Sequence, residues 1–217
     1  HRSWTWLGWI GVLGAFLVLS FYSVIAGFSL NYMVETFAGR LSDLTPEQSV
    51  THFTQDIGGS FPIVLGWHSL FMALTVFIVA RGIKGGLERA VTYLMPALFL
   101  LLVLLVIYSL AVGEAGQALQ FLFQPRLDEL TTENVLQALG QAFFSLSLAL
   151  GAIMTYGAYV SREISLPRSA LIIAAADTSV ALLAGLAIFP HVFQYGLEGN
   201  AGPGLVFITL PLAFPAL

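Results

Sequence analysis

The sequence predicts an all-α integral membrane protein that crosses the bilayer five times. Hydrophobic residues make up 58% of the 217 residues, charged residues make up only 9%, and the mean hydropathy is +0.88. A soluble domain contains about 25% charged residues, so this composition excludes a water-soluble globular protein. Charge-poor segments recur along the chain, and each approaches or exceeds the roughly 20 residues that cross a hydrocarbon core as a helix.

The five predicted spans form one membrane domain over residues 1–217. Their approximate limits are residues 4–37, 61–80, 90–112, 134–160 and 169–190. The segment that follows, residues 198–217, is short and interrupted by prolines, so we expect an apolar external loop or short helix that packs back onto the protein. The chain has no basic-then-apolar signal region at its start and stops in a proline-rich run, so we expect a piece of a longer protein.

The basic residues predict the orientation of the spans. Six of the eight Lys and Arg residues precede the first span or lie between spans two and three or four and five: Arg2, Arg81, Lys84, Arg89, Arg162 and Arg168. Acidic residues dominate the other connections. The positive-inside rule makes the basic face cytoplasmic, which places residues 39–56 outside in a multi-pass cell-membrane protein.

Several functional classes lack their usual sequence pattern. The chain has no cysteine, which excludes disulfides and thiolate metal sites. His52, His68 and His191 do not form a ligand pattern, and no nucleophile–base pair indicates an enzyme. The short basic loop at residues 81–89 reflects topology rather than nucleic-acid binding. The absence of cysteines and of glycosylation acceptors favours a prokaryotic protein, so we expect the bacterial inner membrane.

The segment Gln141–Val160 is the most informative part of the chain. It lies within an uncharged stretch, yet Ser145, Ser147 and Gly151 stand close together at its middle. A lipid-facing helix gains nothing from such residues. A helix broken at membrane depth is tolerated only where its freed backbone is buried in protein or lines a cavity. The segment therefore predicts a discontinuous helix at a binding site, and transport is the first function it indicates.

Asp177 is the one charge within the fifth span. A charge at the bilayer centre costs about 2.5–3.5 kcal/mol, so such residues face the protein interior or a water-filled path. Asp177 can serve as a sodium ligand, a proton carrier or a fixed negative charge. The structural alternative is a helix-packing hydrogen bond, or a position nearer the interface.

Oxygen ligands for a hard cation are available near the predicted break. The Ser145 and Ser147 hydroxyls, freed carbonyls and a carboxylate are the ligand types that such ions prefer, and half-helix ends would direct their dipoles into the gap. The alternative is that these serines join membrane helices by hydrogen bonds.

Three further residues stand out. Tyr22 lies mid-span, where its hydroxyl needs a partner, either a substrate carboxylate or a neighbouring helix. Gly86 and Pro96 bracket the start of the third span, and a proline there frees a carbonyl while a glycine permits a hinge. An ordinary kink is the alternative for this pair.

Several segments resemble, in order along nearly the whole chain, the neurotransmitter:sodium symporter family. GQAFFSLSLALGAIMTYGAYV resembles the sixth helix of that family, and FLFQP the loop before it. RGIKGGLERAVTYLMPALF, with Gly86 and Pro96, resembles the fifth helix. SFYSV resembles the third helix at its substrate tyrosine, and GPGLVFITLP the external loop before the eighth helix.

This resemblance implies that the five spans are the third to seventh helices of an inverted-repeat (LeuT-like) transporter fold, with one discontinuous helix near Ser145–Gly151. It also implies sodium-coupled symport of an amino acid, apolar or aromatic, into the cell by alternating access. The first and eighth helices, which complete the substrate pocket and both sodium sites, would lie outside this chain.

The resemblance also implies residue roles. Tyr22 would meet the substrate carboxylate, Phe144 would close over the substrate, and Ser147 would contact it. The apolar wall would comprise Val18, Ile25 and Leu150, and Leu150 is smaller than the aromatic residue of some members, which leaves room for a larger apolar or aromatic substrate. The first sodium site would include Ser145 and Asp177.

Asp177 departs from the family pattern, which often has asparagine there. The extra carboxylate supplies a fixed negative charge, so the resemblance implies that Na⁺ is required and chloride is not. Gly86 and Pro96 would allow local unwinding for sodium release.

Two other functions stay open. A proton-coupled amino acid permease of related fold would use Asp177 as its proton carrier. A channel or receptor is disfavoured because Ser145, Ser147 and Asp177 do not form the ring of charges or carbonyls that a pore needs. The expected partners are an amino acid, Na⁺ and the lipid bilayer, with no nucleic acid and no sequence indication of an oligomeric state.

Overall fold

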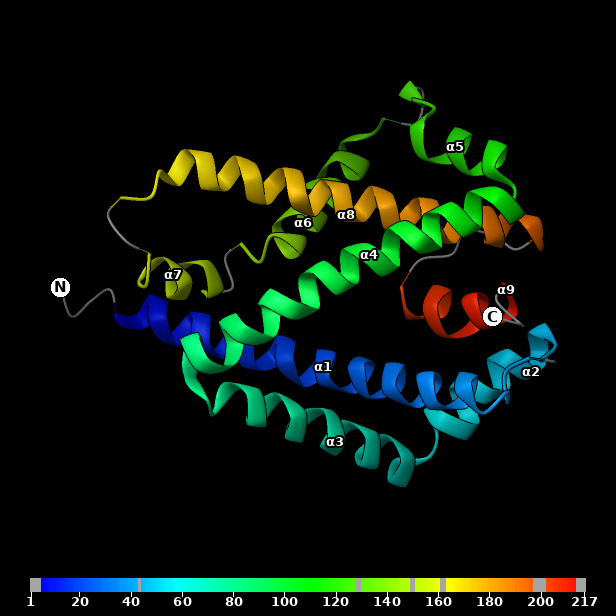
Figure 1. Ribbon diagram of the computed structural model, residues 1–217, viewed down its shortest axis with the longest axis horizontal. Coiled ribbons are helices and arrows are strands. Elements are labelled where there is room, and N and C mark those ends of the chain that lie inside the picture. Colours follow the sequence, from blue (N-terminus) through cyan, green and yellow to red (C-terminus); the bar gives the residue numbers. More distant parts are fainter. Residues whose placement is uncertain are drawn as a thin grey trace. The chain divides into compact units, whose positions relative to one another are not determined.

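The computed structural model describes residues 5–42, 44–127, 130–148, 151–160, 163–196 and 202–213, and every regular element in these ranges is a helix (Figure 1). The chain divides into two compact units. The first comprises residues 1–21 and 123–182, and the second comprises residues 22–122 and 183–217. The all-α prediction is confirmed.

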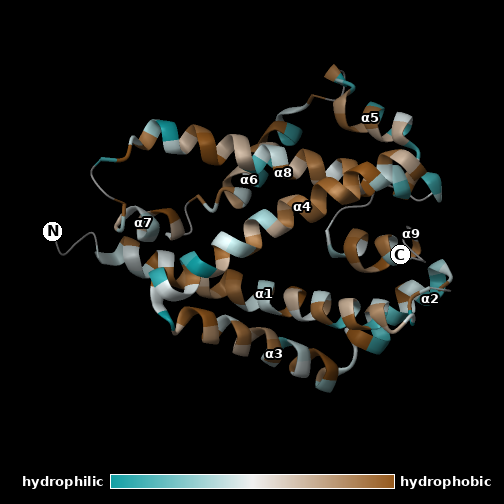
Figure 2. Ribbon diagram, in the orientation of Figure 1, coloured by the Kyte–Doolittle hydropathy of each residue, from teal (hydrophilic) through white to brown (hydrophobic). Residues whose placement is uncertain are grey.

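Four helices in the described ranges are long and apolar enough to cross a membrane. They are α1 (Thr5–Phe37), α3 (Phe61–Val79), the continuous helix formed by η3 (Ile83–Glu88) and α4 (Arg89–Val112), and α8 (Leu166–Gln194). Hydrophobic residues run along them (Figure 2). Many large apolar side chains on these helices are exposed; Trp9 is 65% exposed and Leu101 is 64% exposed. Exposed apolar surface on this scale requires lipid or another protein segment to cover it.

The fourth predicted span consists of two short helices, α6 (Thr132–Ser145) and α7 (Ala152–Gly157). The predicted discontinuity near Ser145–Gly151 is therefore confirmed. The Thr131 hydroxyl caps α6 by accepting a hydrogen bond from the Asn134 N–H at 3.2 Å. The second half is shorter than predicted, because α7 ends at Gly157, and glycine is a poor helix former.

The 39–56 connection contains a helix that the sequence analysis did not predict. α2 (Pro46–Thr51) begins with a capping box, in which the Thr45 hydroxyl accepts from the Gln48 N–H and the Gln48 side chain accepts from the Thr45 N–H. The helix continues as η2 (His52–Ile57), a π-helix. A further unpredicted helix, α5 (Ala115–Phe123), follows α4.

A small core in the second unit anchors the C-terminal segment, which forms η5 (Leu205–Thr209) and α9 (Leu210–Ala213) beside α2 (Figure 1). The Tyr32 hydroxyl on α1 donates to the Phe207 carbonyl at 2.9 Å. The Ser49 hydroxyl on α2 donates to the Ile208 carbonyl at 2.9 Å. Phe53 stacks on the buried Phe207 ring with centroids 5.3 Å apart. The segment therefore packs against α1, α2 and η2.

The end of α4 is bonded to α8 within the second unit. The Ser109 hydroxyl donates to the Ala187 carbonyl at 2.5 Å, and the Glu114 N–H donates to the Pro190 carbonyl at 2.9 Å. Pro190 lies inside α8 and has no N–H of its own to donate. These two bonds fasten α8 near its proline to Ser109 of α4 and to Glu114, just beyond the end of α4.

Candidate functional site

The candidate site begins where the backbone leaves α6. The Leu148 N–H donates to the Phe143 carbonyl at 2.8 Å, and the next described residue, Gly151, has φ +76°. Ser147 has φ +54°, a left-handed conformation that is uncommon for a residue with a side chain. Such conformations cluster at functional sites, where the surrounding structure holds them. The break is therefore a defined backbone feature rather than a frayed helix end.

The structure brings two predicted sodium ligands together in the first unit. The hydroxyl of Ser145, the last residue of α6, donates to Oδ1 of Asp177 on α8 at 2.5 Å. A hydroxyl oxygen and a carboxylate oxygen at a helix break are suitable ligands for a hard cation such as Na⁺.

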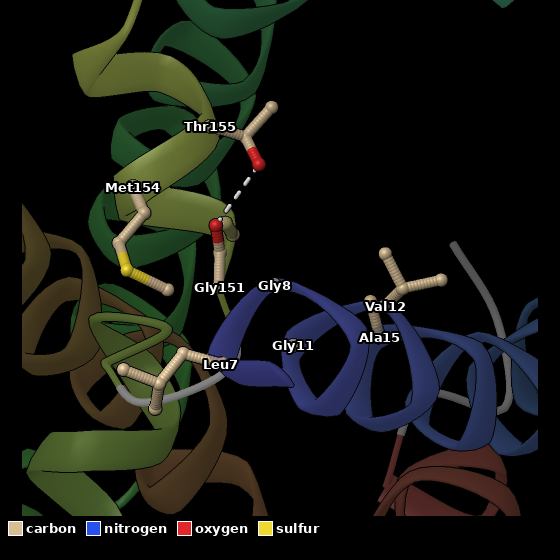
Figure 3. Close-up of a pocket in the computed structure, with 9 residues that line it drawn as sticks. Leu7, Gly8, Gly11, Val12, Ala15, Gly151, Met154 and Thr155 are labelled. Atoms are coloured by element: carbon tan, nitrogen blue, oxygen red, sulfur yellow. Dashed lines mark hydrogen bonds between the residues drawn. The ribbon is translucent and has the colours of Figure 1, made fainter. Parts of the chain in front are cut away.

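A cavity of about 480 Å³ lies beside α7 in the same unit (Figure 3). The Gly151 carbonyl accepts hydrogen bonds from both the hydroxyl and the N–H of Thr155, each at 3.0 Å. A Cβ on Gly151 would lie 3.0 Å from the Gly11 Cα, so α1 and the start of α7 touch backbone to backbone. The cavity is lined by Leu7, Gly8, Gly11, Val12, Ala15, Gly151, Ala152, Met154 and Thr155.

The α1 side of this cavity was not predicted from the sequence. Gly8, Gly11 and Ala15 are spaced three and four residues apart and therefore share one helix face. Small residues on one face of a membrane helix indicate close backbone contact, so this pattern was available in the sequence. The left-handed backbone of Ser147 carried no such signal, because serine rarely adopts that conformation.

The other predicted substrate-binding residues occupy different parts of the structure. Phe144, next to Ser145 in α6, is 46% exposed. Val18 lies on the part of α1 that belongs to the first unit, whereas Tyr22 and Ile25 belong to the second. Their spacing of four and three residues places them on one face of α1. Leu150 lies outside the described residues.

Gly86 and Pro96 also have defined places. Gly86 is buried in η3, and Pro96 lies inside α4 with its side chain exposed. A Cβ on Gly86 would collide with the carbonyl oxygen of Ile78 and lie 3.1 Å from the Arg81 Cβ. Glycine at this position therefore permits η3 to fold against the end of α3.

Replacement of Gly86 by alanine is expected to destabilise the protein by about 1–3 kcal/mol, as overpacking of a filled site does. The matched control is Gly85→Ala, because a Cβ on Gly85 meets nothing within 4 Å. Thermal unfolding of the complete protein in detergent checks the prediction. Equal losses in the two variants would show that space at Gly86 is not the reason for its glycine.

Comparison with known proteins places this site in a family. The model of the sodium:neurotransmitter symporter family matches residues 48–217. The chain is 46% identical over its full length to YhdH of Bacillus subtilis, an uncharacterised sodium-dependent transporter. It is 37% identical to an uncharacterised sodium-dependent transporter of Haemophilus influenzae. Each alignment covers 100% of this chain and 48% of the relative.

The fold has a close match among solved structures. The crystal structure of MhsT in complex with L-phenylalanine superposes with a TM-score of 0.86 at 45% identity, covering 99% of this chain and 48% of MhsT. The chain thus spans about half the length of the relatives it matches, and the LeuT-like transporter fold predicted for it is confirmed. This multi-pass membrane chain belongs to the sodium:neurotransmitter symporter family.

Proposed function

We propose that the chain forms the central part of a sodium-coupled amino acid symporter. The observation that carries the proposal is the Ser145–Asp177 hydrogen bond at the break between α6 and α7, in a chain of this family. The relatives in Bacillus subtilis and Haemophilus influenzae are named as sodium-dependent transporters, which supports sodium as the coupling ion.

Sodium would bind at the break. The Ser145 hydroxyl and the Asp177 carboxylate would each direct an oxygen toward the ion, and their mutual bond would be exchanged for bonds to it. The negative charge of Asp177 would offset the positive charge of Na⁺. The ion would thus favour the conformation in which the substrate pocket is complete.

The substrate would be an apolar or aromatic amino acid. MhsT, with 45% identity, was crystallised with L-phenylalanine, which supports this class. The Tyr22 hydroxyl would donate to the substrate carboxylate, Ser147 would contact the substrate, and Phe144 would cover it. The side chain would rest against Val18, Ile25 and Leu150.

Transport would proceed by alternating access from the outside to the cytoplasm of a bacterial cell. Closure of Phe144 would exclude the outside, and rocking of one helix bundle against another would then expose the site inward. Gly86 and Pro96 would permit local unwinding of the segment that joins η3 to α4, which would open a path for sodium release.

Binding of a radiolabelled amino acid panel to the complete protein, with Na⁺ or with choline in its place, tests the proposal. We expect apolar and aromatic amino acids to bind only with Na⁺. Binding that is independent of Na⁺ but depends on pH would instead identify a proton-coupled permease, with Asp177 as the proton carrier.

Transport is expected to be independent of chloride. The Asp177 carboxylate already supplies a fixed negative charge beside Ser145, so a second anion is not needed to balance Na⁺. Uptake into proteoliposomes with chloride or with gluconate as the anion checks this, and equal rates are expected. Uptake that stops in gluconate would contradict it.

A further inference from the structure

The imidazole ring of His52 lies between two carboxylates at the start of η2. Its Nε2 is 2.7 Å from Oε2 of Glu35 on α1, and its Nδ1 is 3.2 Å from Oδ2 of Asp56 on η2. A neutral imidazole carries one N–H and can donate to only one of these oxygens. The other ring nitrogen would then present a lone pair to a carboxylate. The geometry therefore fits the doubly protonated ring, which donates to both.

The two carboxylates differ in their surroundings. The side chain of Glu35 is 13% exposed and that of His52 is 20% exposed, whereas that of Asp56 is 63% exposed. A largely buried charge that loses its partner is costly, while an exposed one is solvated by water. The bond between His52 and Glu35 therefore carries most of the interaction, and Asp56 adds a weaker contact.

Few other titratable groups surround the ring. Tyr32 on α1 contacts it edge-on at a centroid distance of 5.9 Å, and the Tyr32 hydroxyl is bonded to the Phe207 carbonyl. The nearby helix α2 carries Glu47, which is exposed, and residues 205–213 contain no titratable side chain. Among the described residues, the side-chain contacts of the ring with charged groups are those with Glu35 and Asp56.

The ring also supports the position of the C-terminal segment. Tyr32, whose ring contacts His52, donates a hydrogen bond to the carbonyl of Phe207. Phe53, which follows His52 in the sequence, stacks on the Phe207 ring with an interplanar angle of 12°. Movement of His52 away from Glu35 would shift both groups that hold Phe207. The segment 205–213 is thus linked to His52 through Tyr32 and Phe53.

We propose that His52 is a proton-binding site that fixes residues 205–213 against α1 and η2. The site is separate from Ser145 and Asp177 and goes beyond the proposed transport function. With the proton bound, the imidazolium donates hydrogen bonds to both Glu35 and Asp56. It thereby keeps Tyr32 and Phe53 in place against Phe207. When the pH rises and the ring loses this proton, the largely buried Glu35 carboxylate loses the positive charge that balances it, and the segment loosens.

Hydrogen–deuterium exchange of the complete protein tests the proposal. The exchange of residues 205–213 is compared between wild type and His52→Gln at about pH 5.5 and about pH 8.5, on either side of the range in which histidine titrates. Comparison at equal pH cancels the intrinsic dependence of exchange on pH. At the lower pH we expect exchange at least about tenfold faster in His52→Gln, as the loss of a charged hydrogen bond predicts. At the higher pH the two proteins should coincide.

Two carboxylate variants complete the test. Glu35→Gln should exchange faster than wild type at the lower pH and match wild type at the higher pH, as His52→Gln does. Glu47→Gln changes an exposed carboxylate on α2 that does not contact His52, so it should behave as wild type. An equal difference between wild type and His52→Gln at both pH values would overturn the proposal, because His52 would then act as a spacer and not as a proton site.

Discussion

Replacement of Asp177 by alanine is expected to abolish sodium-dependent amino acid binding by the complete protein. Asp177 is the carboxylate that the Ser145 hydroxyl contacts at 2.5 Å, and it supplies the negative charge of the proposed ion site. Loss of groups that only orient metal ligands already weakens metal affinity by about 10–100-fold, so loss of a charged ligand should cost at least as much. A sodium titration of substrate binding measures the change.

Variants around Asp177 separate the ion site from general damage to α8. Ser145→Ala removes one neutral ligand and should weaken sodium affinity less than Asp177→Ala does. Ser179→Ala is the matched control, because its hydroxyl bonds the Ala175 carbonyl within the same helix. That variant should bind sodium and substrate as wild type does. If Asp177→Ala keeps its sodium dependence while Ser179→Ala also binds normally, the ion lies elsewhere.

Much of the fold could be predicted because membrane helices are constrained by length and charge. The charge-poor stretches in residues 4–37 and 61–80 coincide with α1 and α3, since a span must satisfy its backbone internally and carry few charges. The break near Ser145 could be predicted for the same reason, because serines and glycine at mid-span have no benefit against lipid. The T-x-x-Q pattern at Thr45 is typical of a capping box and could have predicted the start of α2, although no helix was predicted there.

The parts that could not be predicted depend on contacts between residues far apart in the chain. The residue patterns identified Ser145 and Asp177 separately, and the family resemblance assigned both to one sodium site. The structure adds the direct contact between their side chains across 32 positions. Glu35 and His52 gave no indication of an ion pair, since neither falls in a recognisable motif. η2, which begins at His52, is a π-helix, a rare element for which the sequence offered no pattern.

Replacement of Gly151 by valine is expected to destabilise the protein severely and to stop transport. Gly151 has φ +76°, and a residue with a Cβ pays about 1–2 kcal/mol in this conformation. Its Cβ would also lie 3.0 Å from the Gly11 Cα, and overpacking of such a site costs about 1–3 kcal/mol. The contact is with backbone, which cannot rotate away as a flexible side chain can. Thermal unfolding in detergent and uptake into proteoliposomes measure the two effects.

Gly157→Ala is the matched control for Gly151, because a Cβ on Gly157 meets nothing within 4 Å and its φ is not positive. This variant should keep its stability and its uptake. A Gly151→Val protein that unfolds like wild type would contradict the backbone contact between α1 and α7. A stable Gly151→Val protein that binds sodium but does not transport would move the role of this glycine from packing to the movement of α7. Thermal unfolding and uptake together therefore distinguish a role of Gly151 in stability from a role in the transport movement.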